Sequence, residues 1–191
     1  MKKIFTLLTV ALISTAAMAQ STWKVDKAHS RLQFTITHLL VSDVDGRFKD
    51  FDATITAAKP DFSDAKVTLV AQTASVDTDN ERRDTHLKSA DFFDTAKNPT
   101  LNFTSTGITS AGAGKYKLTG NLTLNGVTKP VTLDFWHRGT IPASGNKKDN
   151  AGFKVTGKIK RSDFNFGKSF GAATLSDEVE IIANGEFAKA S

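Results

Sequence analysis

The stretch that decides the fold covers residues 115–137 and reads KYKLTGNLTLNGVTKPVTLDFWH. Apolar and polar side chains alternate in its first half, residues 116–124, and again in its second half, residues 131–137. A period of two is that of a β-strand with one buried face. Between the halves, Asn125-Gly126 supplies two residues that tolerate the positive φ angles of a tight hairpin turn. The stretch therefore predicts an antiparallel β-hairpin.

Outward from this hairpin, six more segments are typical of strands, by alternation or by their content of Val and Thr. They cover residues 31–38, 51–55, 66–76, 101–105, 153–159 and 179–187. Phe48 is out of phase with residues 51–55, which predicts a bulge near Lys49-Asp50. Antiparallel strands with one apolar face each must protect their edges, and closure into a barrel does so. We expect an all-β fold, an extended eight-stranded antiparallel barrel, with a two-sheet sandwich as the alternative.

One segment, Asp79 to Ser89, breaks the period of two. Its helix-forming residues carry acidic side chains early and basic side chains later, which is the order that the helix dipole favours. We expect one short helix there, covering one end of the barrel. Phe92-Phe93 follows it, and a solvated loop has no reason to carry two Phe residues unless they fold inward over an apolar interior.

Residues 1–19 have the three parts of a Sec-type signal peptide. Two lysines follow Met1, residues 4–13 form an apolar run, and an Ala-Met-Ala cleavage motif ends at Ala19. The apolar run is shorter than the roughly 17 to 25 residues of a membrane-spanning helix. We therefore expect cleavage after Ala19, a single mature domain over residues 20–191, no stable membrane insertion, and a location in the periplasm or outside the cell.

The composition excludes several kinds of chemistry. The 191-residue chain has no Cys, which rules out disulfides, thiolate metal sites, Cys nucleophiles and lipid attachment through a thiol. Its formal net charge of +5 is too small to argue for nucleic acid as a partner. Its aromatic residues are 14 Phe, two Trp and one Tyr. Phe suits a dry interior, whereas an outer-membrane barrel needs girdles of Trp and Tyr, so the sequence favours an apolar face that points inward.

Two patterns resemble an enzyme or metal site but lack the required context. Residues 167–171 fit the G-x-S-x-G pattern around Ser169, but a nucleophile elbow needs an acid and then a His downstream, and the last His is His137. We interpret the segment as a loop at the barrel mouth, and a hydrolase using Ser169 is the unfavoured alternative. Residues 77–81 resemble the start of a calcium loop, but Arg82 occupies the position that needs Gly.

The four His residues show no metal-ligand spacing, so we expect no metal ion. His38 and His137 are the better candidates for function because each ends a row of apolar residues on one strand face. A polar tip that ends an apolar wall is where the head group of a quinone or a phosphate would be held. Phe92-Phe93 and residues 164–170 place Phe in predicted loops, which indicates an apolar rim around the opening.

The mature chain resembles the YceI-like family of secreted isoprenoid-binding proteins from Trp23 onward. Four ordered blocks carry the resemblance: His29-Ser30, Phe34, Ile36, His38-Leu39, Gly46, Phe48, Phe51 and Ile55; Ser75-Val76-Asp77-Thr78, Arg83-Asp84, His86-Leu87-Lys88-Ser89, Asp91-Phe92-Phe93-Asp94 and Pro99; residues 120–131, GNLTLNGVTKPV; and Arg161-Ser162-Asp163-Phe164. The chain departs from the family pattern at Ala53 and Asn165, where Gly is more usual, and at Asn98, where an aromatic residue is frequent.

The resemblance implies an extended lipocalin-like barrel whose apolar cavity holds a polyisoprenoid or similar long-chain lipid without catalysis. An isoprenoid quinone fits the same description, and a fatty acid or fatty amide is the alternative ligand. We expect no catalytic residue and no cofactor. A homodimer is left open. The residues expected to contact the ligand are Phe34, Ile36, His38, Phe48, Phe51, Leu87, Phe92, Phe93, Leu101, Phe103, Leu122, Phe135, His137, Phe164, Phe166 and Phe170.

Overall fold

The computed structural model describes residues 20–190, and the predicted signal peptide lies outside them. The described chain forms one antiparallel sheet with a single α-helix and two 3-10 helices. Its elements are β1 (Ser21–His38), β2 (Ser42–Phe48), β3 (Phe51–Ala57), β4 (Lys66–Gln72), η1 (Thr73–Ser75), β5 (Val76–Asp77), α1 (Glu81–Leu87), β6 (Thr100–Gly112), β7 (Lys115–Leu124), β8 (Val127–Ile141), β9 (Asn150–Lys160), η2 (Arg161–Phe164) and β10 (Leu175–Lys189). Within these residues no helix is both long and apolar enough to cross a membrane.

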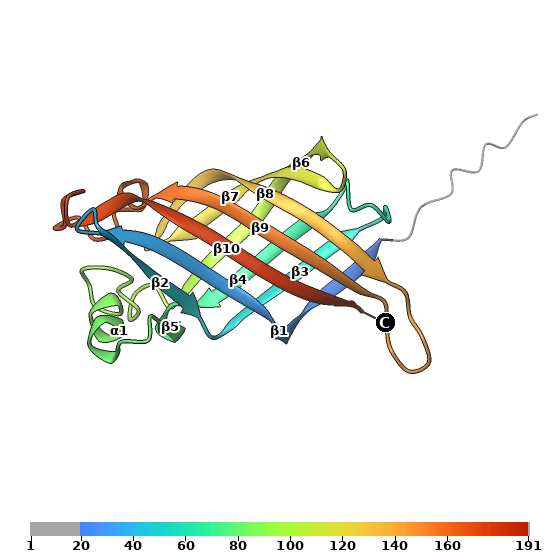
Figure 1. Cartoon of the computed structure of the whole chain (residues 1–191), viewed down its shortest axis with the longest axis horizontal. Coiled ribbons are helices and arrows are strands. Elements are labelled where there is room, and N and C mark those ends of the chain that lie inside the picture. The colour runs from blue at the N-terminus through green and yellow to red at the C-terminus, as the bar shows by residue number, and fades with distance from the viewer. Residues whose placement is uncertain (1–19, 191) are drawn as a thin grey trace, which may run out of the picture.

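The sheet closes into a barrel because β10 pairs with β9 on one side and with β1 on the other. The ten strand segments trace eight barrel strands, since β2 and β3 follow the same edge of β1 and β5 continues the path of β4 beside β2. Neighbouring barrel strands are consecutive in the chain, and Figure 1 shows them winding steeply around a long barrel. The predicted barrel is confirmed, and the sandwich alternative is wrong.

The predicted hairpin turn and the predicted short helix both form. Asn125 and Gly126 have φ angles of 50° and 71° and join β7 to β8 in a hairpin, with Leu124 opposite Val127. Helix α1 begins after Asn80, whose side chain accepts a hydrogen bond from the backbone N–H of Arg83. The expected irregularity at Lys49-Asp50 is a bend between β2 and β3.

A larger bulge lies in β1, which extends further toward the N-terminus than the sequence pattern predicts. The register with β10 changes between Asp26, opposite Glu186, and Arg31, opposite Asn184. Ser30 is buried at 2% exposure, and its hydroxyl accepts the backbone N–H of Glu186 at 3.1 Å. The serine side chain thus replaces the ladder hydrogen bond that the bulge removes.

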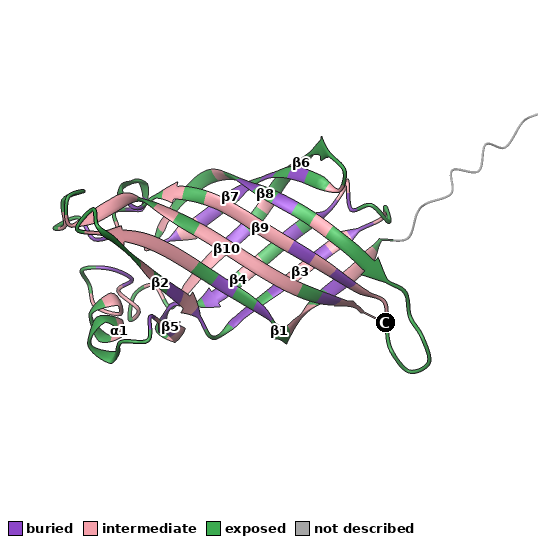
Figure 2. Ribbon diagram, in the orientation of Figure 1, coloured by how far each residue is buried: buried purple, intermediate pink, exposed green. Residues whose placement is uncertain are grey.

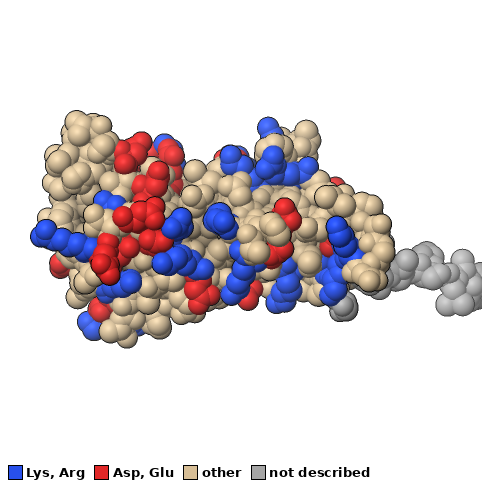
Figure 3. Space-filling model, turned by 60° about the horizontal axis from the view of Figure 1, so that its bottom comes forward, with Lys and Arg blue, Asp and Glu red and all other residues tan. Residues whose placement is uncertain are grey.

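The outward face of the barrel is charged. Lys117 on β7 pairs with Asp134 on β8 at 2.6 Å, and Lys158 on β9 pairs with Glu178 on β10. Blue and red side chains are spread along the barrel surface in Figure 3. The apolar rows of the strands therefore face inward, as the shortage of Trp and Tyr predicts.

Aromatic side chains fill the end of the barrel opposite α1. Phe62, from the connection between β3 and β4, is 1% exposed and packs against Trp23, His137 and Phe153 with ring centroids 4.6 to 5.3 Å apart. Tyr116 closes the same region, and its hydroxyl donates to the carbonyl of Asp61 at 2.6 Å. This end of the interior is a dry core.

The position of His137 predicts a pH dependence of stability. Burial beside Phe62 and Phe153 lowers the pKa of His137 below its ordinary 6.5. As the pH falls below 6.5, His137 becomes protonated in the unfolded chain but stays neutral in the folded chain. The free energy of unfolding therefore decreases as the pH falls from 6.5 to the lowered pKa of the folded state. The cause is desolvation of the imidazolium form.

We therefore expect the melting temperature of the natural chain to fall more than that of His137→Phe between about pH 8 and about pH 5. Phe keeps an aromatic ring at this position but cannot titrate. Comparing the two proteins cancels the contributions of the other titrating groups. Parallel pH profiles would contradict the assignment.

Candidate functional site

The inward-facing rows are fully buried at one end of the barrel and half-buried at the other. On β10, Phe187 is buried, whereas Val179 and Ile181, nearer the α1 end, are intermediate. On β8, Phe135 is buried and Val131 is intermediate. Figure 2 shows the same change along β9 and β10, from pink near the α1 end to purple segments toward the opposite end. Inward apolar residues that stay accessible show that the interior at the α1 end is hollow.

The hollow is a cavity of about 360 Å³. Aliphatic and aromatic side chains from β1, β2, β4 and β6 to β10 form its walls. The polar residues that reach it include Gln33, Thr78, Arg83, His86 and Arg161. Its volume lies in the range of small-molecule sites, which are concave, mostly apolar and marked by a few polar groups.

Most of the residues predicted to contact a ligand line this cavity. These are Phe34, Ile36, His38, Phe48, Leu87, Phe92, Phe93, Leu101, Phe103, Leu122, Phe166 and Phe170. The structure places Phe51, Phe135, His137 and Phe164 outside the lining. Phe135 and His137 pack in the aromatic end, and Phe51 and Phe164 belong to the buried core. His137 therefore lies at the end of the barrel opposite the mouth, too far away to contact a head group held there.

The prediction missed the aliphatic wall of the last three strands. Val131, Val155, Ile159, Val179 and Ile181 all line the cavity. Each stands in the apolar phase of a predicted strand, so the alternation contained the signal. The prediction missed these residues because it favoured aromatic over aliphatic side chains as ligand contacts.

Large and small residues are matched across the cavity wall. Phe34 on β1 lies opposite Gly46 on β2, and a Cβ built on Gly46 would come within 2.2 Å of the Phe34 ring. Glycine at this position lets the ring lie flat against the neighbouring strand. The Phe34 ring therefore occupies the space that a side chain at position 46 would fill.

Aromatic rings close the mouth of the cavity at the α1 end. Phe92 stacks on Phe170 with centroids 5.2 Å apart, contacts Phe166 at 5.3 Å, and meets the ring of His86 edge to face at 5.0 Å. His86 is in turn hydrogen-bonded to Asp91 at 3.0 Å. The cluster joins the segment after α1 to the connection between η2 and β10, in agreement with the predicted apolar rim.

Arg161 shapes this connection from inside. It is 6% exposed, and its five N–H donors all bond to backbone carbonyls, those of Phe166, Gly167, Phe170, Leu175 and Ser176. A guanidinium saturated in this way has no donor left for a ligand. Arg161 therefore holds the mouth loop in place rather than binding a head group.

Arg83 differs from Arg161 in having unused donors. Its Nε donates to the Thr78 hydroxyl at 2.8 Å and its Nη2 to the Thr78 carbonyl at 2.7 Å. Asp84 accepts the Thr78 backbone N–H and hydroxyl, which ties α1 to the end of β5. Arg83 lines the cavity, and within residues 20–190 its Nη1 donors have no hydrogen-bond partner.

The segment around Ser169 does not form a nucleophile elbow. Such an elbow is a sharp turn from a strand into a helix. Here the segment connects η2 to the strand β10, and Ser169 is exposed on it. The interpretation of residues 167–171 as a loop at the mouth is confirmed.

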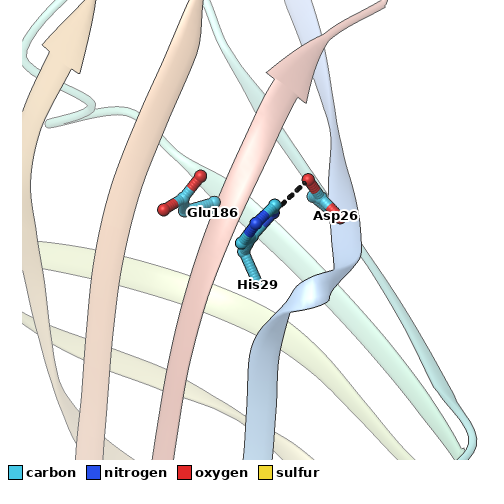
Figure 4. A group of neighbouring side chains, drawn as sticks. All are labelled: Asp26, His29 and Glu186. Carbon is cyan, nitrogen blue, oxygen red and sulfur yellow. Dashed lines mark hydrogen bonds and ion pairs between the residues drawn. The ribbon is translucent and has the colours of Figure 1, made fainter.

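A separate group of titratable residues lies on the surface, at the bulge of β1. Asp26, His29 and Glu186 hold their ligand-type atoms within 4.8 Å of one another (Figure 4). Asp26 bonds the His29 ring at 2.8 Å, which raises the pKa of His29 and lowers the pKa of Asp26, while Glu186 accepts from Asn150. These contacts stabilise the bulge, so we assign the group to the fold and not to a site.

The fold and its cavity define a class: closed antiparallel barrels that enclose an apolar pocket. A family model described as the YceI-like domain matches residues 23–187. "Protein YceI" of Salmonella newport is 44% identical over 179 residues, which cover 92% of this chain and 91% of the relative. The chain belongs to the YceI-like family.

Solved structures agree with this assignment. The YCEI protein of Campylobacter jejuni has a TM-score of 0.74 at 38% identity and covers 81% of this chain and 90% of its own. BcnA of Burkholderia cenocepacia has a TM-score of 0.73 at 27% identity, covering 85% and 98%. A polyisoprenoid binding domain from Saccharophagus degradans, with a TM-score of 0.66 and 14% identity over 90% and 100%, shares the fold.

The two neighbouring Phe residues at the mouth are expected to differ in function. Both are buried, but the ring contacts of Phe92 are all with residues of the rim, whereas Phe93 packs on Phe48 as well as on Phe166 and belongs to the core cluster. Phe93→Ser should lower the free energy of unfolding by about 3 kcal/mol or more, the usual cost of removing a core ring. Phe92→Ser should cost less stability and should instead speed the dissociation of a bound apolar fluorescent probe.

The comparison needs thermal melts of both delipidated variants and stopped-flow dissociation of the probe. Each variant is the control for the other, because both remove one ring from adjacent positions. Equal effects of the two substitutions on both measurements would contradict the division between rim and core.

Proposed function

We propose that the protein binds and carries one long-chain apolar lipid, a polyisoprenoid or an isoprenoid quinone, in the barrel cavity and without catalysis. The observation that carries the proposal is the accessible apolar interior at the α1 end. An interior of this kind in a folded protein gains stability when a hydrocarbon replaces water or empty space. The Saccharophagus domain, described as polyisoprenoid binding, motivates the choice of isoprenoid among chain lipids.

The walls supply enough apolar contact for useful affinity. Each buried methylene contributes about 0.8 kcal/mol, so roughly ten buried carbons contribute about 8 kcal/mol before the costs of ordering the chain. No catalytic residue is needed for such binding.

The polar groups at the mouth favour a ligand whose head group accepts hydrogen bonds. Arg83 has unused donors that line the cavity, and His38 and His86 lie at the same end. A quinone carbonyl or a phosphate oxygen matches donors of this kind. We assign the head group to Arg83 rather than to His137.

The proposal includes export. The signal peptide predicted over residues 1–19 would place the mature domain, residues 20–191, in the periplasm or outside the cell. There an apolar lipid needs a carrier to cross water between membranes. A barrel that shields the chain and leaves the head group at the mouth is suited to that task.

Organic extraction of the protein purified from its own host, followed by mass spectrometry, tests the proposal. We expect one lipid with an isoprenoid chain and an oxygen-bearing head group, in stoichiometric amount. A fatty acid or fatty amide in that amount would replace the isoprenoid assignment. Delipidated protein that takes up no long-chain isoprenoid alcohol would contradict the function.

A further inference from the structure

The turn between β1 and β2 exposes three large apolar residues at the mouth end. Leu39, Leu40 and Val41 are 53%, 70% and 83% exposed. We call these three residues the apolar tip. Singly scattered apolar residues are ordinary on a surface, but a contiguous cluster marks a site of interaction with another protein or a membrane.

The backbone of the tip is unfavourable for its side chains. Leu39 and Leu40 have φ angles of 52° and 61°, in the left-handed region. Leucine is strained there because its Cβ crowds the following carbonyl oxygen. The β7–β8 turn meets the same requirement with Asn125 and Gly126. Phe62 has a similar φ of 61° but is buried in the core, whereas Leu39 and Leu40 are exposed, so packing within the fold does not account for the two leucines and a functional hypothesis is warranted.

The tip is attached to the mouth loop. The backbone N–H of Leu39 donates to the carbonyl of Thr174 at 2.9 Å, and the backbone N–H of Thr37 donates to the Ser176 hydroxyl at 3.1 Å. Across this contact Ala172 and Ala173 are exposed, and Lys168 is the one charged residue between positions 165 and 175. Figure 3 shows an uncharged lobe at the same end of the molecule.

We propose that the apolar tip docks the mouth of the barrel on the surface of a lipid bilayer, so that the ligand passes between membrane and cavity without crossing water. The proposal rests on the carrier function proposed above. The tip adjoins the mouth of a cavity walled by apolar residues. Three side chains on one turn are far smaller than the roughly 800 Å² per partner of a stable protein interface, whereas they suffice for shallow, reversible insertion among lipid head groups.

The charge around the tip indicates how it would bind. Asp43 and Asp45 follow it on β2 and accept hydrogen bonds from Thr37 and Thr35. Lys168 offers one positive charge against these two acids. Docking should therefore depend on apolar contact and respond weakly to anionic lipid and to salt.

The test uses the whole mature chain and the double variant Leu39→Asn/Leu40→Gly. Both new residues accept positive φ, so the variant should fold at least as stably as the natural chain. The matched control is Ile141→Asn, because Ile141 is 71% exposed but ends β8, at the other end of the barrel. Co-sedimentation is measured with vesicles of phosphatidylcholine, with and without phosphatidylglycerol, at low and high salt.

We expect the natural chain and Ile141→Asn to bind both kinds of vesicle at either salt concentration, and the double variant to bind at least tenfold more weakly. A dansyl-labelled farnesyl probe should move from the double variant into vesicles at least tenfold more slowly, while its equilibrium affinity in solution stays unchanged. Equal vesicle binding and transfer by all three proteins would overturn the docking proposal.

Two further results also count against docking through the tip. Binding that requires phosphatidylglycerol and is lost in salt would assign the contact to charge. Natural chain that sediments as a dimer, with the double variant monomeric, would make the tip an interface between copies. If the probe binds none of the proteins in solution, the carrier function fails, whereas the vesicle measurement still decides whether the tip docks.

Discussion

Pairing of β1 with β10 is the constraint on which the rest of the structure depends. It removes both edges of the sheet and sets the number of strands, and the strand number sets the width of the interior. At this width, side chains can fill the interior or leave room for one ligand. The protein does both along the barrel axis, with rings such as Phe62 and Phe153 filling one end and branched residues such as Ile159 and Val179 lining the cavity toward the other.

The mouth depends on a second interaction, the saturation of Arg161 by backbone carbonyls. A buried guanidinium needs its donors satisfied, and here the mouth loop satisfies them instead of a carboxylate. The loop in turn holds Phe166 and Phe170 against Phe92. The β1–β2 turn bonds to the same loop through Thr174. One arginine thus positions both the aromatic rim and the apolar tip.

Local patterns predicted most of the strands, the Asn125-Gly126 hairpin and a short helix within residues 79–89, because each is determined by residues close in sequence. The aromatic filling could not be predicted in this way. Phe62 reaches Phe153 only through the register of distant strands. For the same reason the sequence could not show that His137, at the end of an apolar row, packs against Phe62 and Phe153 outside the cavity lining.

The residues of the candidate site also fall into those that local sequence patterns could predict and those that they could not. Alternation could identify the aliphatic wall at Val179 and Ile181, since inward positions follow from phase. The difference between Arg161 and Arg83 could not be read from sequence, because it depends on which carbonyls each guanidinium meets. Asn165 is an intermediate case: the family resemblance made Gly the expected residue at this position, and the φ of 55° is one that Gly adopts freely and Asn accepts.

Methyl NMR of the delipidated protein, titrated with a long-chain isoprenoid alcohol, tests most directly the claim that the hollow half of the barrel receives a lipid chain. The account predicts chemical shift changes at Val155, Ile159, Val179 and Ile181, which line the cavity. It predicts unchanged methyl signals for Ile55, buried in the core, and for Ile141 on the surface. Changes confined to surface methyls, or an unresponsive cavity wall at saturating alcohol, would contradict it.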